Sequence, residues 1–194
     1  MRPELVFLLE EPSAKAMLDT LLPRILNPLI RHRLIPFEGK QDLEKQLERK
    51  LRGYLNPDAR FLIMRDQDSH ADCKALKATI VAKCVAAGKG NVSLVRIACR
   101  ELESFYLADL GAVESALDIQ GLRKLQGNAK YREPDRLGSP SMELNELTRG
   151  KYQKVGGSRN LGSHLDLDNT RSSSFSNLIQ GIKRLESQLL NVMK

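Results

Sequence analysis

The chain has little of the residue types that mark several common protein classes. Its 194 residues contain no tryptophan, five phenylalanines and four tyrosines. Extensive stacking on nucleic-acid bases requires aromatic side chains, so this mode of binding is not favoured. The three cysteines, Cys73, Cys84 and Cys99, have no C-x-x-C spacing. An odd number without this spacing argues against a disulfide framework and against a zinc site.

Long apolar runs and a nucleotide-binding signature are also missing. No run approaches the roughly 20 apolar residues that a membrane-spanning helix requires. The N-terminal apolar run is followed at once by two glutamates, a pattern typical of neither a signal peptide nor a transit peptide. The phosphate-binding pattern G-x-x-x-x-G-K-[ST] does not occur. We therefore expect a cytoplasmic protein without a membrane span, and any ATP-driven control would come from a separate protein.

Basic residues outnumber acidic ones along the chain. There are 31 lysines and arginines against 24 aspartates and glutamates, a net charge of +7 at pH 7, and the isoelectric point is about 9.4. Excess positive charge attracts polyanions such as nucleic acid. The alternative interpretation is a solubilising surface, because a net charge of this size is not rare.

The first hundred residues alternate short apolar runs with helical patterns. Strands are predicted over 5–10, 34–37, 61–65 and 93–98, and helices over 13–22, 41–54, 71–87 and 101–110. Strands separated by helices indicate βαβ units and a parallel sheet. The predicted fold class is α/β, a three-layer sandwich with a central, mostly parallel sheet of about four strands.

The character of the sequence changes near residue 121. Between Gly121 and Asn160, nine basic residues stand against four acidic ones, with frequent glycine, proline and serine. This composition predicts a basic segment of loops and short helices. A final helix over 175–193 carries an apolar stripe that predicts packing on the sheet, with a partner-binding surface as the alternative. We therefore predict an α/β core over 1–120 and a basic, helical extension over 121–194.

Acidic residues follow three of the four predicted strands. The pairs are Glu10 and Glu11, Asp66 and Asp68, and Glu101 and Glu103. In open parallel sheets, ligands bind beyond the carboxyl ends of the strands. Crowded carboxylates repel one another and resist burial, and carboxylate oxygens are the ligands that Mg²⁺ prefers. The pattern predicts a metal site, although each pair alone also fits an ordinary surface, and Asp68 or Ser69 could cap the next helix.

A glutamate after the first strand and Asp-x-Asp after the third resemble the Toprim domain of topoisomerases, primases and OLD-type nucleases. More closely, the chain resembles a Toprim-related bacterial family, the domain-of-unknown-function family numbered 4276. The stretches that carry this resemblance are FLLEEPS at 7–13, EGK at 38–40, RDQD at 65–68, RELESFYLAD at 100–109, KVGG at 154–157 and SF at 174–175. The resemblance covers most of the chain, and Glu11 replaces the glycine of the usual Toprim turn.

The resemblance implies a Toprim-like fold and a set of site residues. Glu10 would serve as a metal ligand or general base, and Asp66 and Asp68 would bind Mg²⁺. Glu101 and Glu103 stand where OLD-type nucleases supply further acids, which implies a second ion. The chemistry would be phosphodiester hydrolysis with two Mg²⁺ ions, or with Mn²⁺ as the alternative, in which one ion activates water and the other stabilises the leaving oxygen.

Positive charge is also expected at such a site, because the transition state gathers charge on the phosphate. Lys154 is the first candidate, since OLD-type nucleases resemble this chain in having a lysine beyond the acidic sheet. Lys40, Lys151 and Arg159 are the candidates for nucleic-acid binding, and a solvated basic residue is the alternative for each. The segment 121–160 would hold the nucleic-acid backbone with little sequence preference.

Two functions remain open at this point. The first is a Mg²⁺-dependent nuclease acting on DNA or RNA, in a bacterial defence or mobile-element system and beside a separate ABC- or SMC-class ATPase. The second is a non-catalytic regulatory subunit of such an ATPase. A nuclease requires Glu10, Asp66 and Asp68 within joint reach of a cation. Phosphoryl transfer on a small nucleotide is disfavoured, because the chain lacks a glycine-rich phosphate cradle.

Overall fold

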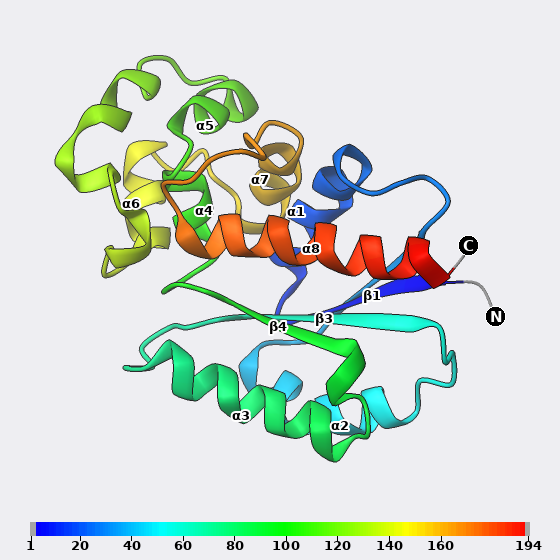
Figure 1. Cartoon of the computed structure of the whole chain (residues 1–194). Helices are drawn as coiled ribbons and strands as arrows, with labels where there is room; N and C mark the ends of the chain where they lie inside the picture. Colours follow the sequence, from blue (N-terminus) through cyan, green and yellow to red (C-terminus); the bar gives the residue numbers. More distant parts are fainter. Residues whose placement is uncertain (1–2, 193–194) are drawn as a thin grey trace.

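The computed structural model describes residues 3–192 and contains a four-stranded parallel sheet. The strands are β1 (Glu4–Leu9), β2 (Arg31–Pro36), β3 (Ala59–Asp66) and β4 (Ser93–Ala98), in the order β2-β1-β3-β4. Each neighbouring pair is parallel, as the helical crossovers predict. Helices cover both faces of the sheet (Figure 1), so the predicted three-layer α/β sandwich is confirmed.

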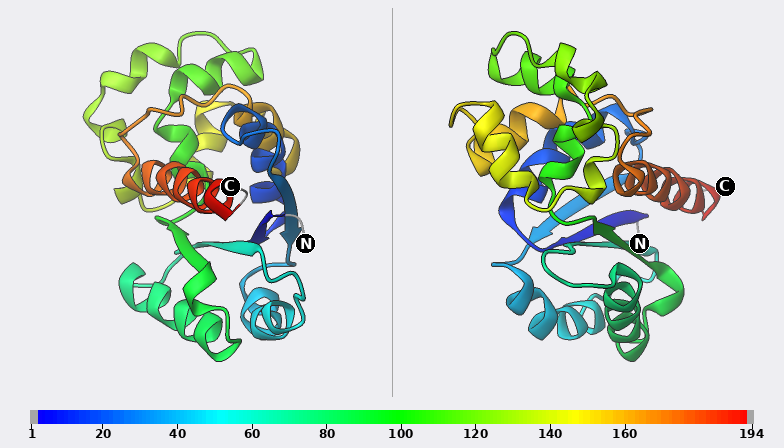
Figure 2. Two further views of the ribbon diagram at one scale, coloured as in Figure 1. Left: turned by 45° about the vertical axis from the view of Figure 1, so that its right-hand side comes forward. Right: turned by 90° about the vertical axis from the view of Figure 1, so that its left-hand side faces the viewer.

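Eight α-helices are described within residues 3–192. They are α1 (Pro12–Leu21), α2 (Lys40–Arg52), α3 (Cys73–Ala86), α4 (Glu103–Leu107), α5 (Leu110–Leu117), α6 (Pro140–Leu147), α7 (Lys154–Gly162) and α8 (Ser173–Val192). Figures 1 and 2 show α2 and α3 on one face of the sheet, and α1 and α8 on the other. The helices α4 to α7 gather on the side of α1 and α8 and form a helical lobe. No described helix is both long and apolar enough to cross a membrane.

Burial on both faces explains the apolar character of the central strands. All six residues of β1 are buried, as expected for a parallel strand that is covered on both sides. Alternation along the strand divides its side chains between two cores. Leu5 and Phe7 belong to the core beneath α1 and α8, whereas Val6 and Leu8 pack toward α2 and α3.

Several helix starts differ from the sequence prediction. Ser13 does not cap α1; its hydroxyl instead donates a hydrogen bond to Glu11 Oε1 at 2.6 Å. Neither Asp68 nor Ser69 caps α3, because the loop continues to Asp72, whose carboxylate accepts from the N–H groups of Lys74 and Ala75. These predictions were wrong because several polar residues in one loop can each satisfy a helix start, and the loop length decides among them.

The predicted helix over 101–110 divides into two. The helix α4 ends at Leu107, and Asp109 then caps α5 by accepting from Ala112 N at 3.0 Å. The C-terminal helix α8 packs on β4, β1 and β3, with Leu178 and Ile182 fully buried, so the predicted packing is confirmed. Its predicted end at residue 193 lies outside the described residues. The division of the chain at residue 120 stays a prediction.

Gly162 lies where α7 packs against α1, and we expect Gly162→Ala to be strongly destabilising. An added Cβ would stand 2.2 Å from the Met17 carbonyl oxygen and 2.4 Å from Thr20 Oγ1. Backbone cannot move aside as a side chain can, so the free energy of unfolding should fall by about 3 kcal/mol, at the high end for overpacking. Urea unfolding followed by circular dichroism measures this change.

The matched control is Gly156→Ala in the same helix. Nothing lies within 4 Å of an added Cβ at Gly156. Alanine is the better helix former by about 1 kcal/mol, so this variant should be neutral or slightly stabilised. A similar loss of stability in both variants would contradict the close α1–α7 packing.

Candidate functional site

The carboxyl ends of β1 and β3 place two acids side by side. Leu9 pairs with Met64 in the sheet, and the Glu10 N–H continues the ladder to the Met64 carbonyl at 3.1 Å. The Glu10 carboxylate then turns back across the strand ends and accepts from the Asp66 N–H at 2.9 Å. The convergence that the sequence predicted for these two acids is therefore present.

Asp66 is the most strongly perturbed acid of the group. Its side chain is buried, and its Oδ2 accepts from the Leu102 N–H at 3.1 Å. Burial raises the pKa of Asp66 well above its usual value, and the negative charges of Glu10, Glu11 and Glu103 raise it further. Within residues 3–192, no lysine, arginine or histidine forms an ion pair with Asp66. The carboxylate is thus held at the strand end by N–H donation rather than by an ion pair.

Glu10 is similarly buried but lies near one arginine. Arg65 Nε stands 3.7 Å from Glu10 Oε2, and the same guanidinium pairs with Glu44. Burial raises the pKa of Glu10, and the Asp66 N–H bond and Arg65 only partly offset this. Arg65 therefore neutralises some of the acidic charge, but the Glu10 carboxyl still favours its protonated form more than a solvated glutamate does.

The two glutamates that follow β4 have different partners. Glu103 is 1% exposed and accepts from the Tyr152 hydroxyl at 2.9 Å. Burial raises the pKa of Glu103, which the bond from Tyr152 partly offsets. Glu101 Oε2 instead accepts from the Ser141 N–H at 2.7 Å, at the start of α6. The structure thus brings Glu103 toward Asp66 and turns Glu101 toward α6.

Lys154 reaches the acids from the start of α7. Its Nζ lies 2.7 Å from Glu11 Oε2, although the two residues are 143 positions apart in the chain. Burial lowers the pKa of Lys154, but the bond to Glu11 and the charges of Glu103 and Asp66 outweigh it, so the pKa is raised. The packing of α7 on α1 places this ammonium group at the acidic edge of the sheet.

Asp68 and Lys40 form the outer side of the site. Lys40 Nζ lies 3.1 Å from Asp68 Oδ2, and Asp68 adopts a left-handed backbone conformation with φ of 52°. Both side chains line an open pocket of about 320 Å³ that also contacts Glu10 and Gly39. Among the buried acids, this pocket gives solvent access to Glu10 at the end of β1.

The other two candidates for nucleic-acid binding lie elsewhere. Lys151 donates to the Asp118 carbonyl at 3.2 Å, and Arg159 Nη1 lies 3.5 Å from Asp19 on α1. Tyr152 is a site residue that the sequence did not reveal. Its hydroxyl also lies 3.1 Å from Ser158 Oγ, and nothing in the residues around it predicts contact with Glu103.

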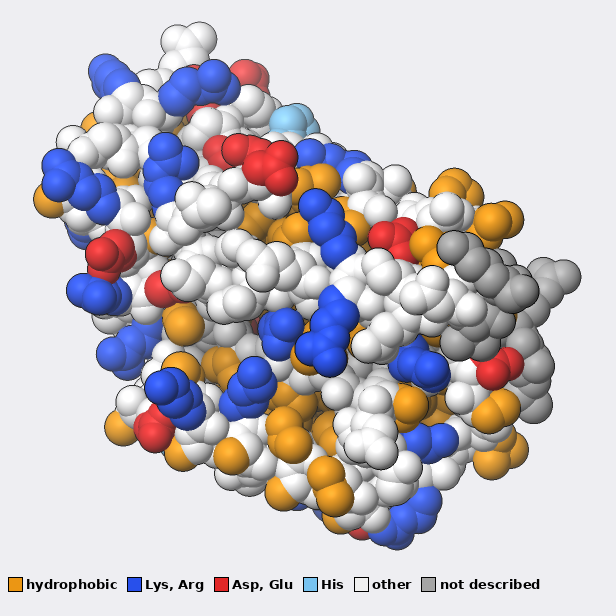
Figure 3. Space-filling model, in the orientation of Figure 1, with side chains coloured by type: hydrophobic (Ala, Val, Ile, Leu, Met, Phe, Trp, Pro, Cys, Tyr) orange, Lys and Arg blue, Asp and Glu red, His pale blue; other side chains and the backbone are white. Residues whose placement is uncertain are grey.

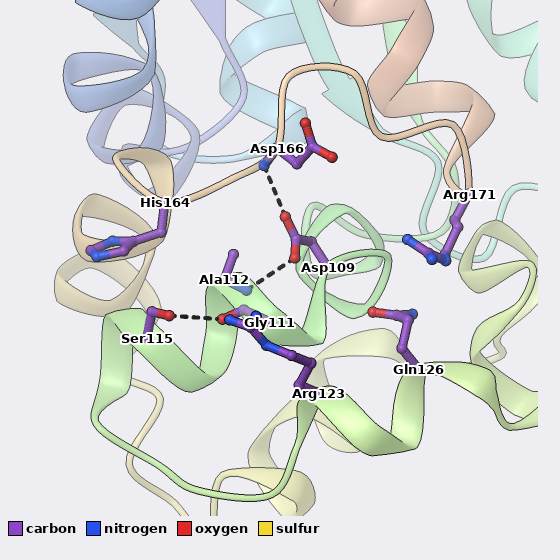
Figure 4. A pocket seen from close by; sticks show the side chains of 9 residues that line it. All are labelled: Asp109, Gly111, Ala112, Ser115, Arg123, Gln126, His164, Asp166 and Arg171. Atoms are coloured by element: carbon purple, nitrogen blue, oxygen red, sulfur yellow. Dashed lines mark hydrogen bonds between the residues drawn. The ribbon is translucent and has the colours of Figure 1, made fainter.

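A larger pocket of about 420 Å³ lies in the helical lobe (Figure 4). Asp109 accepts there from the N–H groups of Ala112 and Asp166, which ties the start of α5 to the loop before α8. Gln126 likewise bonds the Leu110 N–H and the Leu107 carbonyl. These polar side chains hold the lobe together. Because Asp109 is used in these bonds, we assign the pocket no part in the acidic site at the sheet edge.

The donor set at the sheet edge suits a hard divalent cation in the chemistry of its atoms. Its atoms are carboxylate oxygens, which Mg²⁺ and Mn²⁺ favour, and the buried acids carry mutually repelling charge. Across residues 3–192, no three acidic, histidine or cysteine side chains stand close enough together to form a ready ligand set. As described, the acids are held by N–H donors, by the Tyr152 hydroxyl and by Lys154.

The raised pKa values predict how stability depends on pH in the absence of metal. The folded state binds protons at Asp66, Glu10 and Glu103 more tightly than the unfolded state, whose carboxyl pKa values are about 4. Their contribution to the free energy of unfolding is therefore largest at low pH and falls as the pH rises through the raised values. Urea unfolding from pH 5 to pH 8, with EDTA present, measures the dependence.

Comparison with Asp66→Asn isolates the contribution of the cluster. Glu4 and Asp72 have lowered pKa values and contribute with the opposite sign in both proteins. The free energy of unfolding of Asp66→Asn minus that of wild type should therefore become more positive from pH 5 to pH 8. A difference that shrinks over this range would contradict the raised pKa of Asp66.

Comparison with known proteins agrees with the fold and with the sequence resemblance. A search of curated proteins finds no match. Among solved structures, the C-terminal region of the Burkholderia pseudomallei OLD protein is similar, with a TM-score of 0.56 and 12% identity over 94% of this chain and 98% of that chain. This likeness shows a shared fold. The family model described as "Domain of unknown function (DUF4276)" matches residues 9–183, and the chain belongs to this family.

Proposed function

We propose that the chain is a nuclease that hydrolyses phosphodiester bonds with the help of Mg²⁺ or Mn²⁺. The observation that carries the proposal is the buried group of Glu10, Asp66 and Glu103, which three different segments bring to one edge of the sheet. Burying like charges is costly unless a cation compensates them. A divalent ion would compensate this cluster and at the same time attract a phosphate.

Each side chain has a role that follows from its position. Glu10 and Asp66 would hold the ion, with Asp68 at the mouth of the pocket, and Glu103 would serve a second ion together with Glu101, once Glu101 leaves the Ser141 N–H. A bound ion supplies an activated water and stabilises the leaving oxygen. The Tyr152 hydroxyl holds the Glu103 carboxylate, and Glu11 holds Lys154 at the acidic edge. The Lys154 ammonium would then stabilise charge on the phosphate.

The sequence and fold support nucleic acid as the substrate class. The stretches around the acids resemble OLD-type nucleases, and the fold is shared with the C-terminal region of an OLD protein. The net charge of +7 favours a polyanionic partner. We also propose that a separate ABC- or SMC-class ATPase controls the activity in a bacterial defence or mobile-element system, because the chain has no phosphate-binding loop of its own.

The test is incubation of the purified chain with supercoiled plasmid, circular single-stranded DNA and a long RNA. The expected result is cleavage of at least one substrate in Mg²⁺ or Mn²⁺ and none in EDTA. Denaturing gels distinguish nicking from complete degradation. Cleavage that continues in EDTA would overturn the role of the metal, and a folded, metal-loaded chain that cleaves none of them would overturn the nuclease.

One observation favours a regulatory subunit as the second candidate. Glu11 is already paired with Lys154, and Glu101 already bonds the start of α6, so both carboxylates have structural partners. A regulatory subunit tolerates amidation of the acids, whereas a metal-dependent nuclease does not. Asp66→Asn should therefore leave any stimulation of a partner ATPase unchanged if this second function holds.

A further inference from the structure

A basic groove runs over the edge strand β4, between α3 and α8. Its hollow of about 250 Å³ is lined by Lys74, Lys77, Arg96 and Asn177, together with residues of β4 and the start of α8. Figure 1 shows β4 between these two helices, and Figure 3 shows lysine and arginine side chains gathered over this face of the molecule. The groove contributes nothing to the acidic site described above, so its charge requires another explanation.

Among residues 3–192, the cations of the groove form no ion pairs, although Lys74 lies near enough to Asp72 for their charges to interact. Lys74 and Lys77 project from α3 and are exposed, and Arg184 on α8 is exposed as well. Burial lowers the pKa of Arg96, and the charge of Arg184 lowers it further, so the two arginines lie close enough to repel. In the part of the chain that the structure describes, none of these four side chains forms an ion pair.

The position of Arg96 is fixed by the surrounding backbone. Its Nε donates to the Asn177 carbonyl at 2.8 Å, and its Nη1 donates to the Val95 carbonyl at 3.2 Å. Gly181 of α8 admits the guanidinium, because an added Cβ would lie 2.8 Å from Nε and 3.0 Å from Nη2. The Nη2 group has no hydrogen-bond acceptor among the described residues, so Arg96, which lines the groove, is a held arginine with N–H donors to spare.

The basic segment 121–160 differs from the groove in this respect. Four of its nine basic side chains are ion-paired, as Lys130 with Glu143, Arg136 with Glu133, Lys154 with Glu11 and Arg159 with Asp19. Pairing reduces the charge that such a segment offers to a polyanion. The groove therefore offers more unpaired positive charge for phosphate binding than the segment 121–160, which the sequence analysis favoured.

We propose that this groove, lined by Lys74, Lys77 and Arg96 and flanked by Arg184, binds the phosphate backbone of the nucleic-acid substrate. The proposal rests on the nuclease function and names the path of its substrate. The groove reaches the carboxyl edge of the sheet, because Cys99 at its end directly follows β4 and precedes the loop that carries Glu101. Contacts to the backbone alone would bind many sequences.

The test compares two triple variants that remove the same charge. Lys74→Gln/Lys77→Gln/Arg184→Gln neutralises the groove at exposed positions. Lys45→Gln/Arg49→Gln/Lys50→Gln neutralises exposed positions on α2 and is the control. Binding of a labelled single strand and a labelled duplex is measured by fluorescence anisotropy in EDTA over a series of salt concentrations, so cleavage does not interfere. Circular dichroism checks that both variants are folded.

The expected result is a smaller salt dependence in the groove variant only. The negative slope of log K against log salt should become shallower by about 2 for the single strand and about 3 for the duplex, since each lost phosphate contact removes roughly 0.7 or 0.9 from its magnitude. The control slope should change by less than about 1. Equal changes of slope in the two variants, or no change in the groove variant, would overturn the proposal that the groove binds the phosphate backbone.

Two further outcomes separate this proposal from the nuclease function. Wild type that binds through the groove but never cleaves, with metal bound, would overturn the nuclease and leave the groove in place. A groove variant that still cleaves, and whose binding has the same salt dependence as wild type, would overturn the groove and leave the nuclease in place. Labelled polyglutamate that binds the wild type as tightly as nucleic acid, and loses the same affinity in the groove variant, would assign the groove to an acidic protein partner instead.

Discussion

Asp66→Asn is expected to abolish metal-dependent cleavage while leaving the chain folded and more stable at neutral pH. The amide has the shape of the carboxylate and keeps an oxygen that can accept from the Leu102 N–H. It removes the negative charge that Glu10, Glu11 and Glu103 repel. The same change removes a ligand for the ion, and loss of several kcal/mol of metal assistance lowers the rate by about 10³-fold or more.

The measurement pairs a cleavage rate with an unfolding curve for each protein. Asp118→Asn is the matched control, because it removes one negative charge from an exposed residue at the end of α5. Asparagine also tolerates the left-handed conformation of that position, where φ is 50°. Cleavage by Asp66→Asn at more than about a tenth of the wild-type rate would contradict the assigned role of Asp66, whatever happens to stability.

Lys154→Gln is expected to lower the cleavage rate by about 10²-fold, the lower range for removing one stabilising charge from a transition state. The ammonium group faces Glu11, Glu103 and Asp66, so its loss also leaves the acidic cluster with less positive charge around it. Because the interaction is with charge that develops during the reaction, the maximal rate should fall more than the apparent substrate affinity. Lys154→Arg should restore part of the rate.

Single-turnover cleavage at saturating substrate measures the effect. Lys151→Gln is the control, since Lys151 is exposed, lies three positions earlier and, among the described residues, its ammonium group bonds only the Asp118 carbonyl. Both variants lose one positive charge from the same segment, so a general electrostatic effect would appear in both. An unchanged maximal rate in Lys154→Gln, with only weaker binding, would reassign Lys154 from the reaction to the holding of substrate.

The sequence predicts the location of the site because parallel strands leave little choice. Apolar runs that alternate with helices must form a sheet whose carboxyl ends share one edge, so acids that follow those runs meet there. Glu10 and Asp66 meet as predicted because Leu9 and Met64 are partners in the ladder. The start of β4 and its end at residue 98 were also predicted correctly, since Ser93 and Ala98 bound a clear apolar run.

The inner arrangement of the site does not follow from the sequence in the same way. Glu101 and Glu103 are two residues apart, and only the turn into α4 decides that Glu103 is buried while Glu101 bonds Ser141. Tyr152 reaches Glu103 across 49 positions, a contact that depends on how the helical lobe folds back. Gly181 likewise looks in the sequence like a residue that weakens a helix, and only the structure shows that it makes room for the Arg96 guanidinium.

The most direct test of the metal site is a calorimetric titration of MnCl₂ into the metal-free chain at neutral pH, with Asp66→Asn titrated in parallel. The predicted result is saturable binding of one or two ions by the wild type, with release of protons from the buried carboxyls, and no binding by the variant. A well-folded wild type that takes up neither Mn²⁺ nor Mg²⁺, or a variant that binds them as the wild type does, would contradict the proposed metal centre.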